Sequence, residues 1–139
     1  MANPGWYCLG IIIGKDHTAF DVARGLQNSN TPLLNYWDGD KGGKNLFIAI
    51  RDCNIFLENI HKVVDLEEYE NRRWTAEAKF LKAFYHFFLF RMYGPIPVIK
   101  TNLPVSSTPE QVKVYREPVN EVADYICELL DEASGDLPE

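Results

Sequence analysis

The sequence contains few of the residues from which metal and redox centres are usually built. Its three cysteines, Cys8, Cys53 and Cys127, lie far apart, with no Cys-x-x-Cys pair and no nearby pair of histidines. This spacing indicates neither a disulfide framework nor a zinc site. We therefore expect all three cysteines to be small buried hydrophobic residues. The three histidines are equally isolated, so the sequence predicts no metal site and no cofactor.

Long hydrophobic runs are also missing. The longest, residues 9–13 and 84–90, fall well short of the roughly 18 to 20 residues that span a bilayer, so we expect no transmembrane helix. The N-terminus has no basic leader before its short apolar run, which makes it a poor secretion signal. Cys8 follows Gly-Trp-Tyr instead of the small residues that precede a lipoprotein cysteine. We therefore expect neither a signal peptide nor a lipoprotein cysteine in this sequence.

Positive charge is scarce as well. The chain has 14 lysines and arginines against 20 acidic residues, a net charge of -6. Because nucleic-acid binding needs a clustered positive surface, the sequence predicts no nucleic-acid partner. Apolar residues, in contrast, make up 46% of the 139 residues and aromatic residues 13%, which is ample for the core of one domain.

No arrangement of side chains indicates catalysis. A nucleophile needs a base within hydrogen-bond reach, and the sequence has no G-x-S-x-G, no H-E-x-x-H and no cysteine with a histidine partner. Glu67, Glu68 and Glu70 could be read as a glycosidase pair, but at a helix start they are better explained by the positive end of the helix dipole. We therefore expect a protein that is not an enzyme.

Three stretches without helix breakers predict helices, near residues 44–64, 67–93 and 118–134, and hence an all-α fold. Residues 1–45 are rich in glycine, proline and asparagine, which predicts irregular loops. The short link between the first two helices predicts an antiparallel hairpin. We interpret residues 1–139 as a single region, with loops in 1–45 and a helical-repeat-like part in 46–139, from a larger domain.

The second of these helices organises the rest of the chain. Ala76, Phe80, Ala83 and Phe87 recur at helical spacing, and we expect them to form one core face. Most of the remaining circumference is also apolar, so this helix needs neighbours on at least two sides. The alanine and phenylalanine spacing is also that of the second helix of a tetratricopeptide unit, in which small residues let the partner helix approach.

Both ends of this helix have recognisable signals. Asp65 and Glu68 have the spacing of a capping box at its start. Gly94 can adopt the left-handed conformation after the last turn, and Pro95 and Pro97 then remove backbone donors. The chain is therefore expected to leave the helix as a stiff apolar arm.

Two segments resemble the signature of the SusD/RagB family. The run AEAKFLKAFY at residues 76–85, followed by YGPIP at 93–97, resembles the family's A-E-A-x-F-[LI]-[RK]-A and Y-G-x-[VI]-P motifs. Further on, Arg116, Glu121, Val122, Leu137 and Pro138 fit the family's next segment. Because two segments match in the right order, the chain is identified as similar to part of the N-terminal half of family members, which run to several hundred residues.

The resemblance implies a fold and a function. The fold would be a tetratricopeptide-like helical hairpin plus a third helix. The function would be non-catalytic capture of an oligosaccharide or other nutrient at the cell outer membrane, with transfer to a SusC-like TonB-dependent transporter. Aromatic rings would lie against sugar faces. The loop aromatics Trp37, Tyr36 and Trp6 are the candidate ligand-binding residues, although Trp37 could instead be packed on the first helix.

A second interpretation stays open. The same helices could form a helical-repeat module that binds another protein and no carbohydrate. A neighbouring transporter gene and an upstream lipoprotein signal would favour the first interpretation. In either case the second and third helices have more apolar surface than this chain covers. We therefore expect the chain either to self-associate or to be marginally stable and bind hydrophobic dyes.

Overall fold

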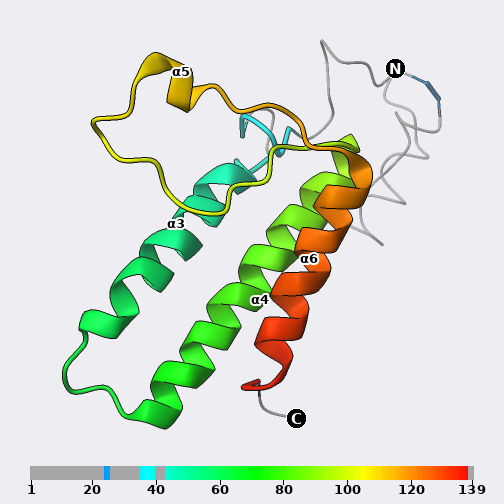
Figure 1. The fold of residues 1–139 in the computed structure, drawn as a ribbon. Helices are drawn as coiled ribbons and strands as arrows, with labels where there is room; N and C mark the ends of the chain where they lie inside the picture. Colours follow the sequence, from blue (N-terminus) through cyan, green and yellow to red (C-terminus); the bar gives the residue numbers. More distant parts are fainter. Residues whose placement is uncertain (1–23, 26–34, 40–42, 138–139) are drawn as a thin grey trace, which may run out of the picture.

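The computed structural model describes residues 24–25, 35–39 and 43–137, and every regular element within these ranges is helical (Figure 1). The three long helices are α3 (Leu46–Asn59), α4 (Glu68–Tyr93) and α6 (Val119–Ser134). A 3-10 turn, Ile60–Lys62, extends α3, and the short α5 (Pro109–Val112) lies in the loop before α6. The predicted all-α fold is confirmed, with each long helix close to its predicted range.

The three long helices lie side by side with α4 in the middle (Figure 1). α3 and α4 run antiparallel, as the short link predicts, and α6 runs antiparallel to α4 along its other side. Within the described residues, α3 and α6 make no contact with each other. All packing between the long helices therefore involves α4.

The helix starts differ in how they are capped. The side chain of Asn45 accepts hydrogen bonds from the first free amides of α3. α4 begins after Glu67, which makes no side-chain capping bond, so the capping box predicted for Asp65 and Glu68 is wrong. The acidic residues of the first turn of α4 still suit the positive end of the helix dipole. A complete capping box occurs instead at Thr108, at the start of α5.

The core joins α3, α4, α6 and the segment that follows α4. Its buried members are Ile50, Ala83, Leu89, Ile96, Val122, Tyr125, Ile126 and Leu129. Tyr36, Trp37 and Tyr93 are among the partly buried residues that pack against this cluster. The turn before α3 is therefore fixed to the same core as the helices.

The expected core face of α4 is only partly correct. Ala76 and Ala83 are buried, but Phe80 and Phe87 are 43% and 47% exposed. The four residues share a stripe by spacing, yet the two large rings lie where neither α3 nor α6 covers them. On a helix that is apolar nearly all round, periodicity alone does not identify which face is packed.

The cysteines also depart in part from expectation. Cys53 is buried on α3, and burial raises the pKa of its thiol. Cys127 is exposed, so its expected burial is wrong. α6 packs against a single helix, and its side away from α4 is left to solvent. Cys8 lies outside the described residues.

The chain leaves α4 as the expected extended arm. Gly94 ends the helix with a positive φ of 71°, and its amide donates to the carbonyl of Phe90. Residues 95–103, here called the exit arm, then cross back over the hairpin of α3 and α4 (Figure 1). Ile96 of the arm is fully buried, and its carbonyl accepts a backbone hydrogen bond from Glu117.

Candidate functional site

A cavity of about 620 Å³ lies between the exit arm, the start of α3 and the turn before it. We call it the arm cavity. Its walls are formed by Trp37, Phe47, Arg51, residues 97–103 and Val114. The volume lies within the range of small-molecule sites, and the mixture of apolar walls with Arg51, Thr101 and Asn102 is typical of such sites.

A tight turn places Trp37 in the wall of the arm cavity. The side-chain oxygen of Asn35 accepts hydrogen bonds of 3.0 Å from the amides of Trp37 and Asp38. The amide of Gly39 donates to the carbonyl of Asn35, and Gly39 has a positive φ of 87°. Residues 35–39 therefore form an ordinary side-chain-stabilised turn.

Trp37 is both packed and part of the cavity wall. Its ring meets the ring of Phe47 edge to face at 4.9 Å and that of Tyr93 at 5.4 Å. The guanidinium of Arg116 lies 4.9 Å from the centroid of the indole ring, within the range of a cation–π contact. The ring of Trp37 thus packs on the start of α3, as one interpretation of the sequence expects, and it also lines the arm cavity. Its role in ligand binding stays a prediction.

The other two candidate residues are placed differently. Tyr36 packs its ring edge-on against Phe88 at 4.8 Å, and its amide donates to the hydroxyl of Tyr93. Tyr36 does not line the arm cavity, although it is the neighbour of Trp37 in sequence. Trp6 lies outside the described residues.

Two side chains of α4 hold the exit arm, and the sequence patterns did not indicate this role. Lys82 is only 4% exposed, and its ammonium donates a 2.6 Å hydrogen bond to the carbonyl of Lys100. His86 is fully buried, and its Nε2 accepts a 3.3 Å hydrogen bond from the amide of Ile99. Consecutive residues of the arm are thus fixed by side chains one turn apart on α4.

These contacts define the protonation state of His86. Its Nδ1 lies 2.8 Å from the carbonyl oxygen of Lys82, which can only accept, while Nε2 receives the amide of Ile99. The proton is therefore on Nδ1, and the ring is neutral. Burial lowers the pKa of His86 to about 4, and the nearby charge of Lys82 adds to this effect. His86 is therefore a packed, neutral histidine of the core.

Residues of α3 hold the arm from the other side. The buried side-chain amide of Asn54 donates a hydrogen bond of 3.5 Å to the carbonyl of Ile99 in the exit arm. Asn102 donates through its side chain to the carbonyl of Arg51 and through its backbone amide to the carboxylate of Glu58. The arm cavity therefore has a wall that is attached to both helices of the hairpin.

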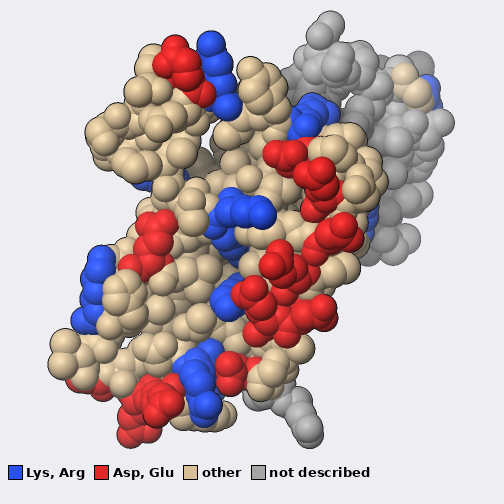
Figure 2. Space-filling model, in the orientation of Figure 1, with Lys and Arg blue, Asp and Glu red and all other residues tan. Residues whose placement is uncertain are grey.

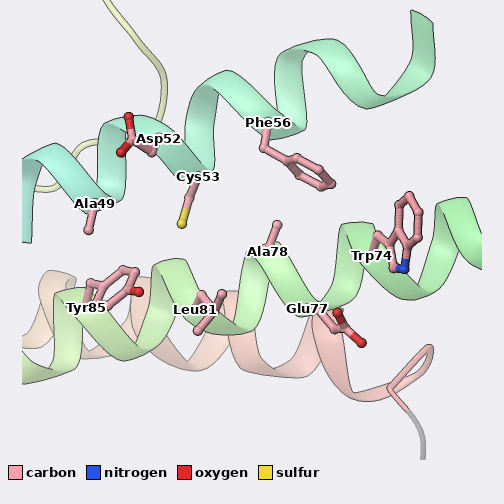
Figure 3. Close-up of a pocket in the computed structure, with 9 residues that line it drawn as sticks. All are labelled: Ala49, Asp52, Cys53, Phe56, Trp74, Glu77, Ala78, Leu81 and Tyr85. Carbon is pink, nitrogen blue, oxygen red and sulfur yellow. The ribbon is translucent and has the colours of Figure 1, made fainter. Parts of the chain in front are cut away.

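A second hollow, here called the hairpin groove, lies between α3 and α4 (Figure 3). Two adjoining cavities of about 460 and 390 Å³ share Asp52, Phe56 and Trp74. Cys53 and Ala78 point into the gap from opposite helices. The lining is mainly apolar, with the thiol of Cys53 and the carboxylates of Asp52 and Glu77 as its ionisable groups among the described residues.

The charges of the described surface are mixed. Figure 2 shows acidic side chains along α6 beside lysines and arginines of neighbouring elements. Lys79 and Glu132 form an ion pair of 2.6 Å between α4 and α6, and Arg72 and Asp136 form a looser one of 3.9 Å. Within residues 24–25, 35–39 and 43–137, no three metal-ligating side chains are grouped, and no helix is long and apolar enough to cross a membrane.

Comparison with known proteins gives a consistent match. Residues 17–139 match the SusD-like family model described as starch-binding and associating with the outer membrane. A laminarin-binding SusD-like protein of known structure is 31% identical, with a TM-score of 0.59 over 67% of this chain and 19% of its own. A SusD-like protein from Bacteroides fragilis is also 31% identical, with a TM-score of 0.60 over 67% of this chain and 17% of its own.

A third structure, a SusD superfamily protein from Parabacteroides distasonis, is 33% identical with a TM-score of 0.56, over 65% of this chain and 19% of its own. The chain therefore spans less than a fifth of the length of these relatives. No curated protein matches it. Since the family model covers most of the sequence, the chain belongs to the SusD-like family.

Proposed function

We propose that this chain contributes a ligand cavity to a non-catalytic, glycan-binding protein of an outer-membrane nutrient uptake system. The observation that carries the proposal is the arm cavity of about 620 Å³ with Trp37 in its wall. Indole surfaces bind the apolar faces of sugars, and Arg51, Thr101 and Asn102 can offer hydrogen bonds to hydroxyl groups. Since one relative binds laminarin, glucan oligosaccharides are the first ligands to test.

The chemistry of the arm cavity supports binding without hydrolysis. Glycosidases use a pair of carboxylates on either side of the scissile bond. Among the described residues that line the arm cavity, none is a carboxylate, and the ionisable ones are Arg51 and Lys100. We therefore expect no release of reducing ends from any glucan by the purified protein.

Calorimetric titration with starch and laminarin oligosaccharides tests the proposal. Trp37→Ala should weaken binding about tenfold, because it removes an aromatic surface from the cavity wall. Trp74→Ala is the matched control, since Trp74 is a tryptophan of α4 that lines the hairpin groove and not the arm cavity. Equal affinities of the Trp37 variant and the wild type would contradict the proposal, as would hydrolysis that a single carboxylate substitution abolishes.

We also propose a SusC-like TonB-dependent transporter as the partner, with the protein at the outer-membrane surface. The support is the family description, which gives association with the outer membrane. Affinity purification of the longest natural form of the protein from solubilised outer membranes should recover a transporter. Recovery of the protein from the periplasmic fraction alone would contradict this part of the proposal.

We also propose that the chain self-associates through the hairpin groove. Phe56, Trp74 and Leu81 line the groove and are each at least 40% exposed, so a second copy that covers them would bury apolar surface. Light scattering should show a mass that rises with concentration. Leu81→Glu should lower this mass, whereas Val105→Glu, in a fully exposed loop, should leave it unchanged. A monomer at all concentrations would contradict this expectation.

A further inference from the structure

We propose that Lys82 and His86 are positioning residues of the arm cavity: they hold the backbone of residues 99 and 100 where the cavity can accept a ligand. The inference rests on the proposed function, because it concerns the shape of the same cavity. Neither side chain lines the cavity itself. Both act through the exit arm, which separates them from it.

The exit arm is the larger part of the cavity wall. Residues 97–103 all line the cavity, together with one residue from the turn, two from α3 and one from the loop before α6. The arm belongs to no helix and no strand, so no regular ladder of backbone hydrogen bonds fixes its position. Among the described residues, a single backbone hydrogen bond joins the arm to another segment. It runs from the amide of Glu117 to the carbonyl of Ile96, just before the cavity wall begins. The wall therefore depends on side-chain hydrogen bonds.

The two α4 side chains, together with Asn54 of α3, which is 2% exposed, make the buried ones among these bonds. Lys82 and His86 are 4% and 0% exposed, whereas the Asn102 bonds to α3 are exposed. A buried ammonium without a partner is strongly unfavourable, and among the described residues Lys82 donates to the carbonyl of Lys100 alone. Loss of the arm from its position would leave this ammonium unsatisfied. The arrangement therefore favours one position of the arm.

The neutral protonation state of His86 makes its hydrogen bond to the exit arm sensitive to acid. The groups that face its ring are the carbonyl and charge of Lys82 on α4, the ring of Tyr125 on α6 at 5.3 Å, and the amide of Ile99. The carboxylates of Glu58 and Glu132 act on Lys82 from α3 and α6. A proton on Nε2 would place a donor against the amide of Ile99 and a second cation near Lys82. Acidification should therefore release residues 99 and 100.

Two variants test the inference by hydrogen exchange and by ligand titration with the glucan oligosaccharides. Lys82→Met keeps the length of the side chain but removes the donor. We expect faster amide exchange in residues 97–103, unchanged exchange in α6, and affinity about 3- to 10-fold weaker. Lys79→Met is the matched control, because Lys79 lies one turn earlier on α4 and pairs with Glu132 instead of the arm.

His86→Gln is the second variant. The glutamine side-chain amide can both donate and accept but does not titrate. The ligand affinity of this variant should therefore match that of the wild type at pH 7. It should also stay constant towards pH 4, where wild-type affinity falls. His86→Ala should bind more weakly at every pH. If Lys82→Met does not fold, the two His86 variants test the inference without it. Equal affinity of His86→Ala and the wild type then overturns the inference.

The outcomes separate the two proposals. A wild-type chain that binds none of the glucans fails the proposed function. Binding that neither Lys82→Met nor His86→Ala weakens overturns only the positioning inference. If amide exchange in residues 97–103 is unchanged in both Lys82→Met and His86→Ala, the positioning inference is overturned whether or not a ligand is found.

Discussion

The side of α4 that meets α6 is filled, whereas the side that meets α3 is open along the hairpin groove. On the α6 side, the stripe of Val122, Ile126, Leu129 and Ala133 is at most 7% exposed. On the α3 side, two cavities of about 460 and 390 Å³ lie along the hairpin. One helix thus has a packed interface and an unfilled one.

Side-chain size explains the difference. α6 offers branched aliphatic residues that fill the space beside Ala83, and small residues in such a place let two helices approach. Along the groove, both helices contribute small residues: Ala49 and Cys53 on α3, and Ala78 on α4. Figure 3 shows Ala49 across from Tyr85, and Ala78 across from Phe56. Small residues on both helices leave space unless the backbones come closer. Small residues allow close packing only where the partner helix supplies volume.

The largest effect should come from comparing a leucine of the core cluster with a leucine of the hairpin groove. Leu89 is fully buried in the core cluster, and Leu89→Ala should lower the free energy of unfolding by about 2 to 5 kcal/mol. Leu81 lines the groove and is 43% exposed, so Leu81→Ala should cost about 1 kcal/mol or less. Urea unfolding of both variants measures the difference. Equal losses would show that the groove is closed in solution.

Acid should weaken the packed side through His86, whose ring meets Tyr125 of α6. Its pKa is about 4 in the folded chain and 6.5 when unperturbed. Above pH 6.5 the ring is neutral in both states. As the pH falls from 6.5 to 4, the unfolded chain binds the proton first, and stability falls by about 3 kcal/mol.

Urea unfolding at pH 7, 5.5 and 4 measures this loss. His86→Gln should lack it, while the carboxylates titrate alike in both chains, so the difference between the two curves isolates the histidine. Parallel curves for wild type and variant would contradict the assigned tautomer and burial.

An intermediate effect should come from one substitution at two alanines of α4. Ala83 is fully buried in the core cluster, and Ala83→Leu should cost about 1 to 3 kcal/mol through overpacking. Ala78 lines the groove, where a leucine has room, and Ala78→Leu should change stability by about 0.5 kcal/mol or less. Thermal unfolding of the pair checks this. A larger loss for the Ala78 variant would reverse the assignment of the two sides.

Sequence patterns were sufficient for the helices and for the end of α4. Periodicity without breakers located the three long helices, because each has an apolar stripe and at least one end at an asparagine, glycine or proline. Gly94 and the two prolines predicted the exit arm for steric reasons that are local to the chain. Local chemistry thus determined these boundaries.

The packed faces of α4 could not be predicted in the same way. Phe80 and Phe87 appeared equivalent to Ala76 and Ala83, since all four lie on one stripe. Which part of that stripe is covered depends on where α6 lies, and this is a tertiary property. An exposed Cys127 on α6 has the same origin.

The candidate site was predicted only in part. Trp37 was selected because it lies in a loop, and it does line the arm cavity, but its role in ligand binding stays a prediction. The roles of Lys82 and His86 were missed because their partners, Lys100 and Ile99, lie 18 and 13 residues away. A polar residue inside an almost wholly apolar helix was the available signal, since a buried lysine needs an acceptor.

The smallest effect should come from the ion pair that crosses the filled interface. Lys79 and Glu132 lie 2.6 Å apart with side chains that are 30% and 46% exposed, so solvent screens most of their attraction. Glu132→Gln should therefore lower the free energy of unfolding by only about 0.2 to 1 kcal/mol, and the loss should shrink at high salt. Glu77→Gln is the matched control, because Glu77 pairs with Arg73 within α4 and joins no second helix. Chemical unfolding at low and high salt measures both. A loss well above 1 kcal/mol for Glu132→Gln would mean that α6 is held to α4 by charge more than by its apolar stripe.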